Sequence, residues 1–116
     1  MKDLELEKGK MSIIVEIIEY VPNSVVVKTI IKKTTGKISA VSFDSGETLT
    51  DRLSRFDNFL QIIDGKAEII INGNSIQLET GQSIIIPAHT HNTIKANIRF
   101  KMLSTIIKSG YDEVEI

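Results

Sequence analysis

The chain has 116 residues, a formal net charge of -1 and 25% charged residues, which is the size and composition of one ordinary globular domain. The near-neutral charge argues against a general electrostatic grip on nucleic acid or on an anionic membrane, because the chain carries no surplus of positive charge. The lack of cysteine excludes disulfides, thiolate catalysis and iron–sulfur ligation, and two histidines leave little imidazole for a metal site.

The start of the chain predicts an N-terminal extension. The opening MKDLELEKGK alternates charges, whereas a secretory leader would need an apolar run. The apolar stretch that follows is too short to cross a bilayer, so we expect a cytoplasmic protein with no membrane partner. Residues 12–20 (SIIVEIIEY) favour either a short helix, from the spacing of their four isoleucines, or a strand, and Pro22 would end a helix.

Short runs of β-branched residues fill the rest of the chain and alternate with turn signals, a pattern typical of an all-β sandwich or barrel. The dipeptide Asp64-Gly65 predicts a tight hairpin turn, because both positions of such a turn need positive φ angles. The tail GYDEVEI is either a last strand or a frayed end. Strands are expected at 24–32, 38–43, 48–54, 58–63, 66–71, 75–79, 83–86, 92–96 and 98–107.

The outer face of the predicted barrel is too apolar to be left bare. In the strand at 59–63, Leu60 and Ile62 face one way while Phe59 and Ile63 face the other, and a single barrel of this size cannot bury both faces. Either residues 12–20 fold back over the outer face or a second copy of the chain covers it. We expect a homodimer.

Two stretches carry a recognisable glycine and proline spacing. GETLTDRLSRFDNFLQIIDG begins at Gly46 and ends at Gly65, and GQSIIIPAHTHNTIKA places Gly81 six residues before Pro87. These frames resemble the two motifs of the cupin superfamily, and the resemblance covers about residues 38–108. It implies a single-domain, all-β, cupin-type double-stranded β-helix (an RmlC-like jelly-roll barrel). The division is then an N-terminal extension at 1–23, the barrel at 24–110 and a C-terminal tail at 111–116.

The resemblance also shows where a metal site would be. In metal-binding cupins two His and a Glu of the first motif, and a His of the second, converge on a divalent ion. The matching positions here hold Arg52, Ser54, Asn58 and Asn92, and neutral oxygens bind such ions weakly. An inward guanidinium ~5 Å from a divalent ion would repel it by roughly 6–7 kcal/mol at an effective dielectric near 20. We therefore expect no metal and no other cofactor.

The two histidines lie in the second motif. His89 and His91 occupy places where that motif usually carries Gly and a free position. They could hold a metal with a third ligand such as Asp57 or Glu47. They could instead contact a ligand or move protons at the barrel mouth, because an unperturbed imidazole titrates near neutral pH. In a third interpretation they are loop residues, bound to backbone and solvent.

Arg52 also has two interpretations. It either points outward and pairs with Asp51 or Asp57, or points inward beside Ser54, Asn58 and Asn92. The inward arrangement would suit a carboxylate, a phosphate or a sugar hydroxyl. Phe56 could wall such a pocket, whereas the residues flanking the turn near 34–36 read as a solvated hairpin tip. Those residues are Lys32, Lys33 and Lys37.

The function expected from the sequence is that of a metal-free cupin that binds a small polar or anionic molecule in the barrel, or of a dimeric binding or sensing module. No residue is assigned a catalytic role. The alternative is an enzyme, either isomerase- or epimerase-like with His89 or His91 as the base, or a metal-dependent oxygenase with both histidines pointing inward. The ligand-binding candidates are Arg52, Ser54, Asn58, His89, His91 and Asn92.

Overall fold

The computed structural model describes residues 5–108. The predicted tail 111–116, and positions 1–4 and 109–110 of the predicted extension and barrel, lie outside the described residues. Within the described part the helical content is a single 3₁₀ turn, Ile14–Glu16. The strands are β1 (Val25–Lys33), β2 (Gly36–Phe43), β3 (Thr48–Leu53), β4 (Asn58–Ile71), β5 (Asn74–Glu79), β6 (Ser83–Ile86), β7 (His91–Lys95) and β8 (Phe100–Ile107).

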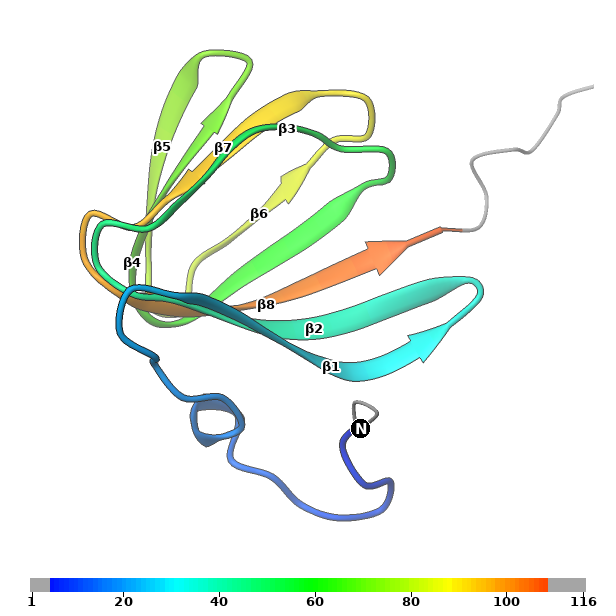
Figure 1. The fold of residues 1–116 in the computed structure, drawn as a ribbon. Coiled ribbons are helices and arrows are strands. Elements are labelled where there is room, and N and C mark those ends of the chain that lie inside the picture. The colour runs from blue at the N-terminus through cyan, green and yellow to red at the C-terminus, as the bar shows by residue number, and fades with distance from the viewer. Residues whose placement is uncertain (1–4, 109–116) are drawn as a thin grey trace, which may run out of the picture.

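All neighbouring strands are antiparallel, and one order, β1-β2-β8-β4-β7-β3, runs through the sheet. Strands β5 and β6 also pair with β4, which makes β4 the central element of the fold. Figure 1 shows the sheet curling over so that β3 and β7 lie across from β2 and β8. This is the jelly-roll arrangement, so the predicted all-β fold class is confirmed.

The predicted hairpin at Asp64-Gly65 is wrong, because β4 runs through this point as one 14-residue strand. Its first half pairs with β8 and β6, its second half pairs with β5 and β7, and the register shifts between Ile62 and Asp64. Gly65 has the positive φ expected of a turn (93°), but uses it to bend the strand from one sheet into the other. The positive φ was therefore predicted correctly, but Gly65 bends a continuous strand instead of closing a hairpin.

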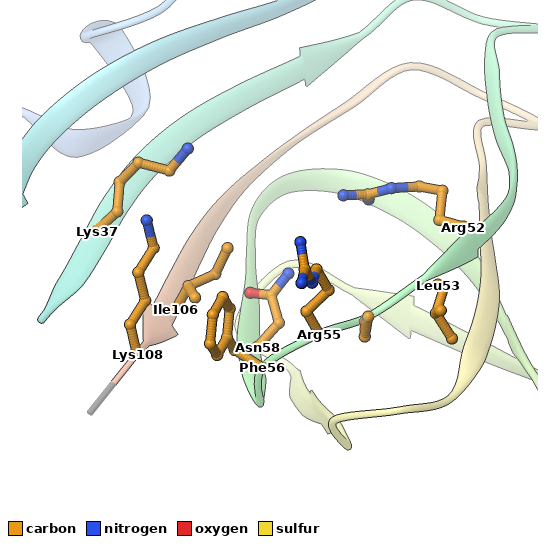
Figure 2. Close-up of a pocket in the computed structure, with 9 residues that line it drawn as sticks. Lys37, Arg52, Leu53, Arg55, Phe56, Asn58, Ile106 and Lys108 are labelled. Atoms are coloured by element: carbon orange, nitrogen blue, oxygen red, sulfur yellow. The ribbon is translucent and has the colours of Figure 1, made fainter. Parts of the chain in front are cut away.

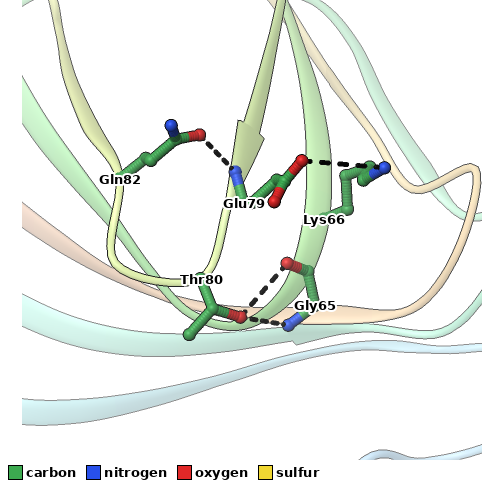
Figure 3. A network of polar contacts seen from close by, with 5 residues as sticks. All are labelled: Gly65, Lys66, Glu79, Thr80 and Gln82. Carbon is green, nitrogen blue, oxygen red and sulfur yellow. Dashed lines mark hydrogen bonds and ion pairs between the residues drawn. The ribbon is translucent and has the colours of Figure 1, made fainter.

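The bend at Gly65 is fastened to the turn that follows β5. Figure 3 shows the Thr80 hydroxyl accepting from the Gly65 N–H (3.0 Å) and donating to the Gly65 carbonyl (3.3 Å). Close by, the Gln82 side chain accepts from the Glu79 N–H (2.8 Å), and Glu79 forms an ion pair with Lys66 (3.9 Å). The bend is therefore braced by the hairpin that its own strand forms. The hairpin turn itself, Asn72-Gly73, has positive φ values of 49° and 86°, as a tight hairpin turn requires.

The inward side chains of β2, β8 and β4 form four layers, from polar at one end of the barrel to apolar at the other. We call the polar end the mouth and the apolar end the base. At the base the two phenylalanine rings stack 4.6 Å apart and are fully buried. From mouth to base the layers are Lys37, Ile106 and Asn58; Ser39, Ser104 and Leu60; Val41, Met102 and Ile62; Phe43 and Phe100.

The N-terminal segment, residues 5–24, bonds to β1 through Leu6 and crosses the outer face of β2 and β8 between Val15 and Glu19. The Ser42 hydroxyl donates to the Glu19 carbonyl (2.8 Å), the Lys101 ammonium donates to the Val15 carbonyl (2.7 Å), and Ile18 is buried. Figure 1 shows this segment lying beneath the curled sheet. The short helix or strand predicted over 12–20 is wrong except for the single 3₁₀ turn, because two of the segment's carbonyls bind side chains of the barrel.

Tyr20 anchors the end of this segment. Its hydroxyl donates to Asp64 (2.6 Å), and its ring faces the cationic groups of Arg99 and Lys101 at 4.5 and 4.9 Å. Burial, and then the hydrogen bond to Asp64, raise the pKa of Tyr20 well above its ordinary value. Tyr20 therefore keeps its proton and fastens the segment to the bend of β4.

None of the helical structure found between residues 5 and 108 has the length or the apolar character that crossing a bilayer requires.

Candidate ligand-binding site

A pocket of about 230 Å³ opens at the mouth of the barrel. Apolar side chains and one buried amide form its floor and walls, and four cationic side chains surround it. Figure 2 shows two ammonium groups on one side of the pocket and two guanidinium groups on the other, with the aromatic ring and the amide between them. The lining residues are Lys37, Arg52, Leu53, Ser54, Arg55, Phe56, Asn58, Ile106 and Lys108.

The two lysines owe their position to strand register. Lys37 lies directly opposite Ile106, and Ile106 directly opposite Asn58, so the three share the inner face of adjacent strands. The backbone N–H of Lys108 donates to the Thr35 carbonyl (2.7 Å), which extends the β2–β8 ladder past the end of β8. Lys108 is then the diagonal neighbour of Lys37 on the same face.

The two arginines come from the opposite wall, at the end of β3 and in the loop after it. Arg52 pairs across the ladder with Asn92 of β7, and directly opposed residues share a face of the sheet. Asn92 is 3% exposed, so that face is the inner one. Of the two interpretations offered for Arg52, the geometry matches the inward one, with the guanidinium at the exposed edge of the pocket.

The charge of the pocket is of one sign. Its lining has four cationic residues and no acidic one. Diagonal neighbours such as Lys37 and Lys108 lie near one another on the sheet, and like charges held close together repel. An anion in the pocket would relieve this repulsion.

Neutral polar groups lie beneath the cations. The Asn58 carbonyl oxygen accepts from the Ser104 hydroxyl (2.8 Å), and the Asn92 amide donates to the Ser54 hydroxyl (3.0 Å). Within the described part of the chain, Asn92 Oδ1 and Ser39 Oγ are buried without a hydrogen-bond partner. Burying an unpartnered polar atom costs free energy, so this end of the barrel retains capacity to bind a further polar group.

The two histidines lie apart from the pocket. His91 is exposed and pairs with Leu53 of β3, which puts it on the face of β7 opposite to the buried Asn92. His89 is exposed in the loop before β7, with φ of 65°, and its N–H donates to the Ser54 carbonyl (2.5 Å). Neither imidazole lines the pocket, so the structure brings together Arg52, Ser54 and Asn58, with Asn92 bonded to Ser54.

The residues at the expected metal positions do not fit a divalent metal. The oxygens of Asn58 and Ser54 are engaged in hydrogen bonds, Asn92 offers one neutral oxygen, and Arg52 brings a positive charge. Over residues 5–108, no three His, Cys, Asp or Glu side chains gather closely enough to hold an ion. The donor set is therefore of the wrong charge and too sparse.

Sequence reasoning missed three of the four cations. Lys37 was interpreted as part of a solvated hairpin tip, which is wrong, since it is half-buried and lines the pocket. The register signal existed, because Lys37 lies two residues before Ser39 on the inward face of β2. Arg55 and Lys108 lie outside the strands, where no alternation predicts the direction of a side chain. Phe56, considered as a possible wall, does line the pocket.

No protein-family model matches the sequence, and no curated protein is significantly similar to it. Solved structures are similar over almost the whole chain. A conserved protein of unknown function from Streptococcus pyogenes has a TM-score of 0.86 at 23% identity, over 95% of this chain and 97% of that one. A cupin superfamily protein from Desulfitobacterium hafniense has a TM-score of 0.83 at 25% identity, over 92% and 98% of the two chains.

The protein has the fold of a small cupin. A cupin 2 conserved barrel domain protein from Leptotrichia buccalis is also similar, with a TM-score of 0.78 at 25% identity, although 81% of this chain covers 46% of that one. The resemblance inferred from Gly46, Gly65, Gly81 and Pro87 is confirmed at the level of the fold. The fold positions the pocket of this cupin at the mouth of the barrel, and its chemistry depends on the side chains found there.

Proposed function

We propose that this cupin binds a small anionic molecule in the mouth pocket. The observation that carries the proposal is the convergence of four cationic side chains on one pocket whose lining contains no acid. Arginine offers paired N–H donors to a carboxylate or phosphate, and lysine adds a point charge. Arg52, Ser54 and Asn58 are the proposed contacts that the sequence also indicated, joined by Arg55, Lys37 and Lys108.

The size of the pocket limits the ligand. A volume of about 230 Å³ corresponds to about eight water molecules of bulk liquid, and it lies below the range of about 300–1,000 Å³ typical of sites for drug-sized ligands. A small acid or a phosphorylated fragment fits this space, whereas a whole nucleotide does not.

The alternative of an acid–base enzyme receives less support from the geometry. His89 and His91 do not line the pocket. Asp57 accepts from the Ala88 N–H (2.8 Å). The Tyr20 hydroxyl donates to Asp64 at the bend of β4, far along the strand from Asn58. Tyr111, the other tyrosine that could serve as an acid, lies outside the described residues. These groups do not share one site with the proposed ligand, so binding is the function that we put forward.

Inorganic phosphate tests the proposal by NMR at fixed ionic strength. We expect saturable shifts of backbone amides at residues 53–58 and beside Lys37 and Lys108. Arg52→Gln should weaken binding by roughly tenfold, as expected for one charge-assisted contact. Lys95→Gln removes the same charge from an exposed position outside the pocket and should leave binding unchanged. Equal weakening by both variants, or no saturable shift at these residues, would refute the proposal.

We also propose that the chain acts as a homodimer, as a binding or sensing module in the cytoplasm. Support for the dimer comes from the outer face of the sheet, where Phe59 and Ile85 pair across β4 and β6 and remain 37% and 59% exposed. The N-terminal segment covers the neighbouring strands, β2 and β8, through Ser42 and Lys101. An apolar pair left uncovered in this way is a favourable surface for association.

A further inference from the structure

The cations of the mouth pocket form two pairs on opposite walls. Lys37 and Lys108 belong to the β2–β8 wall, where the ladder makes them diagonal neighbours. Arg52 and Arg55 belong to the end of β3 and the loop after it. Figure 2 shows the two pairs facing the same space from its two sides. A ligand with charge at one end only would meet one pair and leave the other unneutralised.

The surface between the pairs combines apolar side chains with a few neutral polar groups. Ile106 and Phe56 lie there in Figure 2, with Asn58 beside them, and Leu53 and Ser54 complete the lining. Asn58 is 6% exposed, and Ser104 already occupies its carbonyl oxygen, so its side chain offers the pocket only the amide N–H, beside the Ser54 hydroxyl. Apolar surface of this kind is best covered by carbon atoms of the ligand.

We infer that the pocket takes a compact molecule with two anionic groups joined by a short apolar chain. One anionic group would lie between the arginines, the other between the lysines, and the chain would pack on Phe56 and Ile106. This inference rests on the proposed function and narrows it to a class of ligand. The pocket volume of about 230 Å³ accepts a linker of a few carbons and no large substituent.

Glutarate and its monoamide, 5-amino-5-oxopentanoate, test the two-ended arrangement by calorimetry at neutral pH and fixed ionic strength. The two compounds have nearly the same size and differ by one charge. We expect glutarate to bind at least roughly tenfold more tightly, since the amide loses a charge-assisted contact at one end. 4-Phosphonobutanoate, in which one carboxylate of glutarate is replaced by a phosphonate, shows whether a terminal group is better matched by a carboxylate or by a phosphate-like group.

Variants of each wall complete the test. In the double variant K37Q/K108Q the preference for glutarate over the monoamide should fall to about twofold or less, because one end of the site is gone. Arg55→Gln should reduce the preference from the other wall, whereas Lys95→Gln should keep it. Circular dichroism confirms that each variant folds.

Equal affinity of wild-type protein for the diacid and the monoamide would overturn the two-ended inference. If phosphate still titrates the pocket residues in that case, the simpler proposal of anion binding survives. If neither phosphate nor any of the acids binds, both the inference and the proposed function fail.

Discussion

At the scale of single residues, the packing of the barrel depends on the lack of a side chain at Gly65. This glycine has φ of 93°, and a Cβ added there would clash with the Arg99 carbonyl oxygen and lie 2.9 Å from both the Cα and the Cβ of Phe100. Phe100 stacks on Phe43 at the base. The absence of a side chain at Gly65 thus permits the bend of β4 and also the close approach of β8 behind it.

Gly65→Ala should therefore destabilise the protein by at least about 3 kcal/mol, from backbone strain and from the clash with β8. The matched control is Gly81→Ala. Gly81 has a similar φ of 90°, but a Cβ there meets nothing within 4 Å, so only the strain of about 1 kcal/mol applies. Urea denaturation of the three proteins measures the difference. Equal losses in the two variants would show that the close approach of Arg99 and Phe100 to Gly65 does not matter.

The residues of the pocket mark the limit of what the sequence predicts at this scale. Motif spacing identified Arg52, Ser54, Asn58 and Asn92 as neighbours, and the structure brings them to one end of the barrel. Spacing could not show which way Arg52 points, because β3 has a register shift between Leu49 and Arg52. A shift of one residue reverses the face to which every later side chain points.

At the scale of elements, the strands were predictable and the N-terminal segment was not. Alternating apolar residues and turn signals mark every strand except the continuous β4, and for those strands local information suffices. Residues 12–20 have helical spacing, yet their structure is set by contacts with residues distant in sequence. Lys101 binds the Val15 carbonyl and Ser42 binds the Glu19 carbonyl. The hairpin at Asp64-Gly65 was mispredicted for a similar reason, since only the partner strands reveal that the chain continues.

Tyr20→Phe should loosen the N-terminal segment, because it removes the hydrogen bond to Asp64 at a cost of about 1 kcal/mol. The raised pKa of Tyr20 means that the folded state keeps the phenol proton at a pH where the unfolded state releases it. This stabilisation is complete below a pH of about 10, the ordinary pKa of tyrosine, and declines as the pH rises above it.

Urea denaturation near pH 8 and above pH 10 tests this prediction. The advantage of the wild-type protein over Tyr20→Phe should shrink at the higher pH, and hydrogen exchange in residues 13–20 should be faster in the variant at the lower pH. A difference between the two proteins that stays constant with pH would show that the phenol proton is not retained on folding.

At the scale of the whole molecule, the sequence predicted the jelly-roll barrel but not how its outer face is covered. The pattern of the strands shows an excess of apolar side chains, because barrel strands such as β4 are apolar on both faces. The structure divides that excess. Ile18 of the N-terminal segment is buried, whereas Phe59, Ile85 and Ile107 stay exposed. Which part is covered by the same chain depends on the path of a segment without regular structure.

If the exposed part is a dimer contact, Ile85→Lys should convert a dimer into a monomer in sedimentation equilibrium, since a charge placed in an apolar contact is costly to bury. Ile98→Lys is the matched control, because Ile98 is similarly exposed (52% against 59%) but lies in the loop between β7 and β8. A wild-type protein that remains monomeric at high concentration would refute the predicted homodimer.

The stacked phenylalanines lie at the base of the barrel, whereas the four cationic side chains lie at its mouth. This separation affects how the sequence of the protein can evolve. Arg52 and Arg55 are largely exposed, and none of the four cationic side chains of the mouth pocket belongs to the apolar core cluster. Substitutions among these four residues therefore change the preferred ligand while leaving the fold intact. Adaptation to a new small molecule would thus require few substitutions and little loss of folding stability. These four positions are where redesign of the ligand preference in the laboratory should begin.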